Sequence, residues 1–161
     1  MADATYQPAV YRKQGGNEIV VASGGTLTVE SGGTITSAVG LRSSGAASGI
    51  GYATGAGGAV TQLTNRSTGV TVDAVCGAIT TDATSLAAGA EATFTVTNSA
   101  VAVGDVVVVS LRSGATAGTS VPLVTAVAAG SFDLTLTNLH ASTADTGASI
   151  INFAVIKSVS A

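Results

Sequence analysis

Charged side chains are the scarcest feature of this chain, because Asp, Glu, Lys and Arg together make up 9% of its 161 residues. A typical soluble domain carries roughly 25% charged residues. The net charge is −3, so the chain lacks the clustered basic surface that nucleic-acid binding needs. We therefore expect no nucleic-acid partner. A surface made of Thr, Ser, Gly and Ala repels its own copies weakly, which favours assembly.

Cysteine, histidine and tryptophan are also nearly absent: the chain has one cysteine (Cys76), one histidine (His140) and no tryptophan. One cysteine cannot form an intramolecular disulfide, and these two residues give no recognisable metal-binding spacing. The continuous apolar runs, such as residues 106–109 and 150–156, are far shorter than the roughly 20 residues of a membrane span. The first 17 residues lack the apolar stretch of a signal peptide. The sequence thus predicts no cofactor, no metal, no membrane contact, and synthesis in a cytoplasm.

Composition divides the chain into four predicted segments. Residues 1–14 form a non-repetitive arm that holds two of the three tyrosines. Residues 15–37 carry an eight-residue repeat. Residues 38–58 are rich in Gly, Ser and Ala and are typical of a linker. Residues 59–161 carry regular strand signals and form the predicted folded domain.

The predicted domain alternates apolar and polar residues with the period of two that marks half-buried strands. The clearest examples are EATFTVTN at 91–98, SFDLTLTN at 131–138 and GVTVDAVC at 69–76. Three further runs are continuously apolar, as in central strands buried on both faces or strands whose outer face another chain covers: residues 105–111, 121–127 and 150–156. No window of about 11 residues keeps a helical period. The sequence therefore predicts an all-β fold with an antiparallel β-sandwich or jelly roll of about seven strands.

The repeat reads EIVVA–SGG–TLTVE–SGG–TITSA, which is three strand segments separated by two glycine-containing turns. Glycine supplies the positive φ that a tight reversal needs. Because eight is an even number, each unit presents the same face, and five aliphatic side chains share one side: Ile19, Val21, Leu27, Val29 and Ile35. Five aliphatic side chains are too few to offset the entropy lost in ordering the segment. We expect a meander or solenoid turns that another copy or another protein covers.

The predicted arm combines aromatic and basic residues in Tyr6, Tyr11, Arg12 and Lys13, with Pro8 between the tyrosines. Tyr and Arg are favoured where a segment docks on a partner, although a disordered terminus explains the same pattern. With the five aliphatic residues that share one side of the repeat, the candidate residues for docking on a partner or for an interface between copies are Tyr6, Pro8, Tyr11, Arg12, Ile19, Val21, Leu27, Val29 and Ile35.

The sequence shows no recognisable group of catalytic residues. The nine carboxylates are scattered singly, and most lie beside turns, where turn hydrogen bonding explains residues such as Asp105 and Asp145. Glycine strings at 49–55 and 114–120 lack the spacing or the lysine of phosphate-binding loops. The sequence leaves open that two carboxylates meet across strands as an acid–base pair. We predict that the chain is not an enzyme.

The phrase YRKQGGNEIVVASGG resembles the N-terminal segment of small virion proteins of tailed bacteriophages, described as head decoration or head-fibre-like proteins. The stretch GYATGAGGAVTQLTNRSTGVTVDAVCGAITT, then LAAGAEATFTVTN and the final INFAVIKSVSA, resemble a β-rich module of phage structural proteins. The resemblance covers most of the chain outside residues 38–48. It implies a non-enzymatic and commonly trimeric virion component. It carries no functional residues over to this chain.

Three functional hypotheses follow from the resemblance and the residue pattern together. The first is a homotrimeric capsid decoration protein that docks on the major capsid protein, in a virion assembled in the bacterial cytoplasm. The alternative is a tail-fibre or receptor-binding tip that binds host glycans through loops at 113–120 or 140–149. The absence of tryptophan removes the usual aromatic platform for sugars and disfavours this alternative. A polysaccharide-cleaving spike fragment is a third and weaker hypothesis.

Overall fold

The computed structural model describes residues 9–12, 15–16, 18–37, 43, 46, 49–114, 116 and 118–158. These residues form ten β-strands joined by turns and extended segments. The described part of the chain contains no helix with the length and apolar character needed to cross a membrane. The chain divides into two compact units, Met1–Gly49 and Ile50–Ala161, with the division inside the predicted linker 38–58. We describe each unit by itself.

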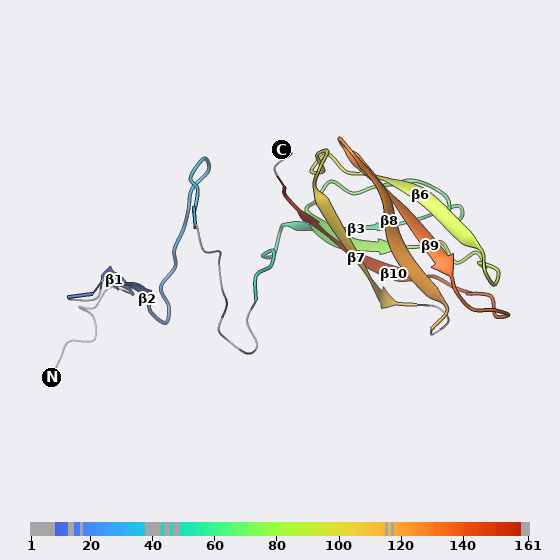
Figure 1. Cartoon of the computed structure of the whole chain (residues 1–161), viewed down its shortest axis with the longest axis horizontal. Coiled ribbons are helices and arrows are strands. Elements are labelled where there is room, and N and C mark those ends of the chain that lie inside the picture. Colours follow the sequence, from blue (N-terminus) through green and yellow to red (C-terminus); the bar gives the residue numbers. More distant parts are fainter. Residues whose placement is uncertain are drawn as a thin grey trace. The chain divides into compact units, whose positions relative to one another are not determined.

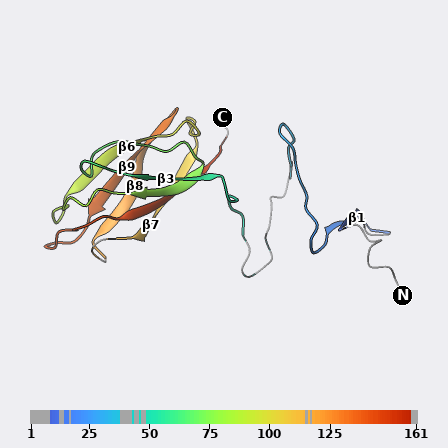
Figure 2. The same cartoon turned by 180° about the vertical axis from the view of Figure 1, so that it is seen from behind.

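The C-terminal unit is a β-sandwich of two four-stranded sheets (Figures 1 and 2). The first sheet has the order β3-β5-β10-β7, formed by Gly57–Thr61, Cys76–Thr80, Ile150–Ile156 and Val106–Ser113. The second has the order β4-β6-β9-β8, formed by Val70–Thr71, Glu91–Thr97, Ser131–Asn138 and Ser120–Ala128. From β3 to β8 the chain alternates between the two sheets. The predicted all-β class is confirmed.

Strand directions differ from the predicted antiparallel arrangement on one side of each sheet. Strand β3 runs parallel to β5, and β4 runs parallel to β6. The other neighbours in both sheets pair antiparallel. Because jelly rolls are antiparallel, the jelly-roll form of the prediction was wrong. The parallel pairs arise because the chain passes through the opposite sheet between their two strands, which supplies the crossover that parallel pairing requires.

Alternation located β6 and β9 correctly but failed at residues 69–76. The buried and exposed side chains of β6 alternate along its whole length. The segment 69–76 was predicted as one strand, yet Val70–Thr71 forms β4 of one sheet and Cys76 begins β5 of the other. Val72, between the two strands, is buried in the core. Periodicity indicates which side chains are buried, but it does not indicate which sheet the backbone joins.

The continuously apolar runs do not all form central strands. Strand β10 is central in its sheet, whereas β7 and β8 are edge strands, so burial of both faces was a wrong prediction for these two. On β7, Val107, Val109 and Leu111 pack against the core. Val106 and Val108 face away from it and are 52% and 49% exposed. The second interpretation of such a run, an outer face that another chain covers, stays a prediction.

The core lies between the two sheets, where the inward side chains of alternating strands meet. Phe132 of β9 and Phe153 of β10 pack with ring centroids 5.8 Å apart and planes tilted by 47°. Gly77 of β5 lies against both Phe153 and β3. A Cβ atom at Gly77 would lie 2.1 Å from the backbone oxygen of Gly58 and 3.0 Å from the Phe153 ring. Glycine is therefore required at this position for β3 to approach β5.

The N-terminal unit contains one two-stranded sheet among its described residues. Strand β1, Val10–Arg12, pairs antiparallel with β2, Ile19–Val21. Strand β2 is the predicted first segment of the repeat, but its partner comes from the predicted arm. Residues 26–29 and 34–36 of the later repeat segments join no sheet in the described part of the unit. The predicted meander or solenoid is therefore not confirmed.

Candidate assembly surfaces

Two identical turns, eight residues apart, organise the repeat. The backbone N–H of Gly25 donates to the oxygen of Ala22, and that of Gly33 donates to Glu30, both at 2.9 Å. The third residue of each turn, Gly24 or Gly32, has a φ of 82° or 85°. A positive φ at the third position alone indicates a type II turn. Type II turns splay the flanking segments instead of closing a hairpin, which explains why the repeat segments do not pair with one another.

The second glycine of each turn is needed for a different reason, which is close approach. A Cβ atom at Gly25 would lie 2.5 Å from the backbone oxygen of Ala9. That oxygen also accepts a hydrogen bond from the N–H of Ala22 at 2.7 Å. A Cβ atom at Gly33 would lie 2.7 Å from the side chain of Val29. The Ser-Gly-Gly phrase thus combines conformational freedom at its first glycine with tight packing at its second.

The five aliphatic side chains that share one side of the repeat in its sequence pattern, called the apolar stripe below, are all exposed. Their exposed fractions fall between 43% and 73%: Ile19 73%, Val21 43%, Leu27 64%, Val29 43% and Ile35 58%. No strand of the N-terminal unit covers residues 26–29 or 34–36 in the described part. Because exposed aliphatic groups are costly in water, the apolar stripe is a candidate surface for binding another molecule.

Strand pairing brings part of the predicted site together. Arg12 of β1 lies opposite Ile19 of β2, and Val10 lies opposite Val21. Residues opposite one another in a ladder share a face, so these four side chains form one exposed patch. Tyr11 lies opposite Val20 and is half-buried on the other face.

Two predicted site residues, Tyr6 and Pro8, lie outside the described residues. One exposed residue was missed in the sequence, since Val10 is 38% exposed beside Val21. The alternation in residues 10–12 was the signal that could have indicated it. The candidate site within the described residues is therefore the pair β1–β2, the two turns that follow it, and the segments with Leu27, Val29 and Ile35.

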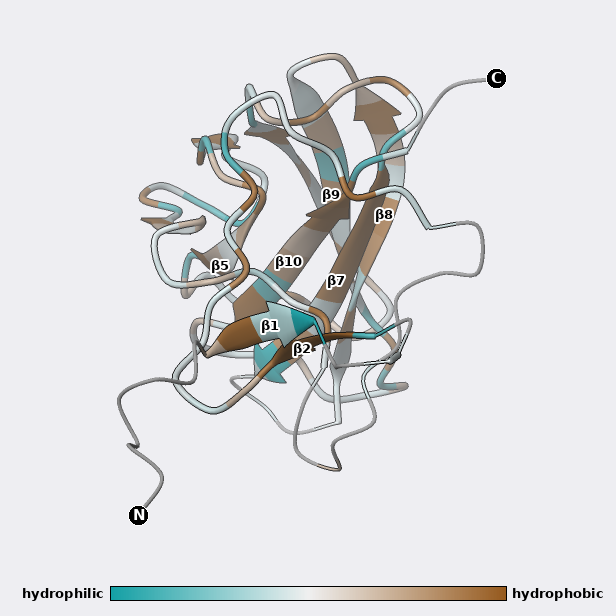
Figure 3. Ribbon diagram, turned by 90° about the vertical axis from the view of Figure 1, so that its left-hand side faces the viewer, coloured by the Kyte–Doolittle hydropathy of each residue, from teal (hydrophilic) through white to brown (hydrophobic). Residues whose placement is uncertain are grey.

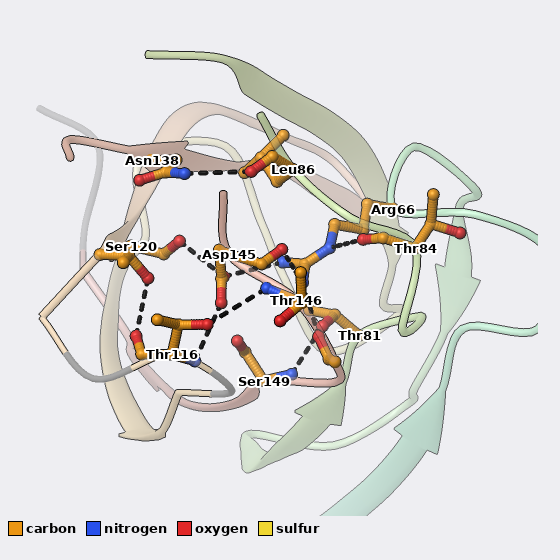
Figure 4. A network of polar contacts seen from close by, with 12 residues as sticks. Arg66, Thr81, Thr84, Leu86, Thr116, Ser120, Asn138, Asp145, Thr146 and Ser149 are labelled. Carbon is orange, nitrogen blue, oxygen red and sulfur yellow. Dashed lines mark hydrogen bonds and ion pairs between the residues drawn. The ribbon is translucent and has the colours of Figure 1, made fainter. Parts of the chain in front are cut away.

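The C-terminal unit contains a buried polar network centred on Asp145 and Arg66, which come from different loops (Figure 4). Asp145 is fully buried, and Arg66 is 4% exposed. Arg66 Nη1 lies 3.2 Å from Asp145 Oδ2, and Arg66 Nη2 donates to the backbone oxygen of Gly147 at 2.6 Å. Ser120 Oγ donates to Asp145 Oδ2 at 2.6 Å, and the N–H of Thr116 donates to Oδ1 at 3.1 Å.

This network joins loops rather than forming a reaction site. Its charged groups are buried and bonded to one another, so a substrate has no access to them. The backbones of Leu86 and Asp145 exchange two hydrogen bonds at 2.9 Å, which ties a third segment to it. Asp145 was predicted as an ordinary turn residue, but its side chain is fully buried. A single acidic residue in a turn phrase gave no sign of a partner 79 positions earlier in the sequence.

A second ion pair holds the last strand of the C-terminal unit. Lys157 Nζ lies 2.5 Å from Asp105 Oδ2, and Asp105 is 5% exposed. The N–H groups of Ala102 and Ser158 also donate to this carboxylate. The hydrogen bond from Lys157, followed by the backbone donors, lowers the pKa of Asp105 below its usual value. Asp105 therefore stays ionised and caps its own turn, as the sequence predicted, while it also anchors the end of β10.

The remaining titratable residues of interest are in ordinary structural roles. The Nδ1 atom of His140 accepts hydrogen bonds from the N–H groups of Ser142 and Thr143, so the side chain caps its own turn. Cys76 is a free thiol at the start of β5. Within the described part of the chain, no three His, Cys, Asp or Glu residues are grouped in a way that could hold a metal ion.

The sheet β3-β5-β10-β7 presents an apolar face away from the core. Val106 and Val108 of β7 lie opposite Ile156 and Ala154 of β10, and the strands β7 and β10 are largely brown in Figure 3. A groove of about 470 Å³ lies on this face, lined by Ile50, Gly51, Tyr52, Ala154 and Ile156. The hydroxyl of Tyr52 donates to the backbone oxygen of Val155, which fixes one wall of the groove.

Comparisons with models of known protein families, with curated proteins and with solved structures found no match to this chain. The resemblance to phage virion proteins therefore stays a prediction. A β-sandwich hosts many unrelated functions, so the fold assigns none by itself. The surfaces that the chain exposes are the observations from which a function can be argued.

Proposed function

We propose that this chain is a non-enzymatic structural protein of a tailed-phage virion, namely a capsid decoration protein. In this proposal the N-terminal unit docks on the assembled shell, and the C-terminal β-sandwich projects from it. The observation that carries the proposal is the apolar stripe, whose five side chains are 43% to 73% exposed. Three of the five, Leu27, Val29 and Ile35, lie on segments that join no sheet in the described part of the unit. Exposed aliphatic groups of this kind are expected where another protein completes the structure.

Two features of the described residues support docking through this unit. The turns at 22–25 and 30–33 have the same hydrogen bond and nearly the same φ, so the two following segments leave their turns in the same way. Val10, opposite Val21, adds aliphatic area to the part of the apolar stripe on β2, and Arg12, opposite Ile19, adds a hydrogen-bond donor. Apolar side chains together with an arginine are a common composition of a binding surface.

The proposal includes a homotrimer whose partner is the major capsid protein. Three copies around one axis can cover each other's apolar stripes, and the low charge of the chain opposes this association only weakly. A protein that binds only the assembled shell also stabilises that shell by mass action. Decoration would therefore raise the temperature at which the shell dissociates.

The test is co-sedimentation of the full chain with empty shells assembled from the major capsid protein of the same phage. We expect the wild type to sediment with the shells and Leu27→Asp to stay in the supernatant, because a carboxylate in the apolar stripe would be buried unpaired. The matched control is Leu63→Asp, since Leu63 is 87% exposed on the C-terminal unit. This control should bind like the wild type.

The light-scattering mass of the same variants reports self-association separately from shell binding. Loss of sedimentation in Leu27→Asp, with a circular dichroism melt equal to that of the wild type, supports docking through the apolar stripe. Normal sedimentation of Leu27→Asp would show that the stripe does not contact the shell. A wild-type protein that is monomeric and does not sediment with shells would refute the proposal.

A further inference from the structure

Each sheet of the C-terminal unit ends in two edge strands, and three of these four edges are short or interrupted. Strand β4 has two residues, and β3 begins with the glycines Gly57 and Gly58. Strand β8 contains Pro122, which has no N–H, and its pairing with β9 shifts between Val124 and Ala126. Short strands, prolines and bulges are the devices by which proteins keep sheet edges from pairing with other chains.

The fourth edge, strand β7, lacks these devices over most of its length. Its residues 106–111, VVVVSL, include no proline, glycine or charged side chain. They pair with β10 in one continuous register, and the irregularity of this ladder comes after Leu111, at Arg112. In the described part of the chain, no strand lies on the other side of β7. A regular apolar edge of this kind is a template for pairing with another strand.

The hydrogen bonds of β10 identify the backbone groups that β7 directs outward. The N–H of Val155 donates at 2.7 Å to the oxygen of Val75, which lies on the side of β5. Val155 is opposite Val107, so these two residues are a pair that β10 and β7 leave without mutual hydrogen bonds. Such pairs alternate along an antiparallel ladder, so Val109 and Leu111 behave alike. We call Val107, Val109 and Leu111 the open edge.

The side chains of the open edge are also incompletely covered. Val107, Val109 and Leu111 pack against the core, but they are only half-buried. On the central strand β10, the inward side chains of Ile151 and Val155 are fully buried. A strand added beside β7 would bond the outward N–H and C=O groups and would cover these side chains at the same time. The open edge therefore fits one kind of occupant, which is an extended strand.

We propose that the open edge pairs antiparallel with the open edge of a second copy, so that two sandwiches share one continuous sheet. The pleat keeps core-facing residues opposite core-facing residues. The register that uses the whole open edge places Val109 opposite Val109 of the other copy, and Val107 opposite Leu111. These residues direct their N–H and C=O groups outward, so each pair exchanges two hydrogen bonds.

Self-pairing is favoured because an antiparallel edge is its own complement, with each outward donor meeting an outward acceptor. Two-fold interfaces of this kind are the commonest in symmetric oligomers. Charge favours the same orientation. The antiparallel arrangement places the Arg112 side chains of the two copies at opposite ends of the shared ladder, whereas a parallel arrangement would place them side by side. This pairing goes beyond shell docking, which is proposed for the N-terminal unit, and does not depend on it.

Amide hydrogen exchange of the full chain, resolved by residue and measured at low and high protein concentration, tests this pairing. Light scattering gives the mass at each concentration. We expect the N–H groups of Val107, Val109 and Leu111 to exchange at least roughly tenfold more slowly at high concentration. The N–H groups of Val108 and Ser110 already point towards β10, so their exchange should change little. Contact through side chains alone would not protect alternate backbone groups.

A charge exchange tests whether the partner is a second copy in this register. Val108 of one copy would lie opposite Ser110 of the other, and both side chains are exposed in the single chain. The double variant Val108→Lys/Ser110→Lys places like charges opposite each other and should abolish the protection of the open edge. The matched control Val108→Lys/Ser110→Glu places opposite charges there and should restore it.

The outcomes separate this inference from the proposed function. Exchange of the open edge that is independent of concentration in the wild type overturns the pairing, whether or not the protein binds shells. Protection lost in both double variants, or kept in both, overturns a second copy in this register and indicates another partner strand or another contact. Leu27→Asp, which tests shell docking, should keep the concentration-dependent protection of the open edge.

Discussion

Replacing Asp145 by alanine tests the buried network more sharply than any other single change. The substitution removes the counterion of the Arg66 guanidinium, which is 4% exposed. Arg66 Nη1 loses its partner at 3.2 Å, although Nη2 keeps the backbone oxygen of Gly147. Ser120 Oγ and the N–H of Thr116 lose their acceptor at the same time.

The expected cost follows from these losses. Removing one partner of a buried ion pair costs about 3–5 kcal/mol. Two orphaned donors would add about 1–3 kcal/mol each if they stayed dry. Water entering the space left by the carboxylate offsets part of this sum. We therefore expect Asp145→Ala to lower the free energy of unfolding by about 4 kcal/mol, a large share of the roughly 5–15 kcal/mol of a typical domain.

Urea unfolding of the full chain, followed by far-ultraviolet circular dichroism, measures this change. A double-mutant cycle with Arg66→Met isolates the pair itself. The double variant should be less destabilised than the sum of the two single variants by about 2 kcal/mol, because neither charge is then left buried alone. Additive effects, or a cost below about 1 kcal/mol for Asp145→Ala, would refute the view that this pair joins the loops.

Two further predictions concern the same unit. Gly77→Ala should destabilise the sandwich by about 3 kcal/mol, because its Cβ would lie 2.1 Å from the Gly58 oxygen. The control Gly51→Ala should leave the stability unchanged, because its Cβ would meet no atom within 4 Å. Equal melting temperatures of the two variants would contradict the close packing of β3 on β5. Asp105 has a lowered pKa in the folded chain, so its stabilisation is complete above its unfolded pKa of about 3.9 and is lost as the pH falls through the folded value. Asp105→Asn should therefore be less stable than the wild type at pH 7, and the difference should shrink in denaturation curves recorded below about pH 4. A difference that is constant with pH would exclude the ionised carboxylate as its source.

The sequence predicted the apolar stripe as an interface, and that role stays a prediction. Its five residues are exposed in the N-terminal unit, as expected for side chains that the chain itself cannot cover. The pairing of β1 with β2 was not predictable, because residues 10–12 lie outside the repeat and the repeat pattern does not indicate which segment pairs with them. The same limit applies to Arg66 and Asp145, whose contact spans two loops.

Sequence alone determined the strand positions and the inward side chains of β6 and β9, because period-two alternation is a local property of each segment. It also determined the two turns of the repeat, since glycine after serine permits the positive φ that each turn uses. Only the tertiary structure decided the parallel pairs β3–β5 and β4–β6, the edge positions of β7 and β8, and the buried partner of Asp145. These strand pairings, edge positions and buried contacts depend on segments that are distant in the chain. The local residue pattern is compatible with several arrangements of such segments, and the free energy of packing selects one of them.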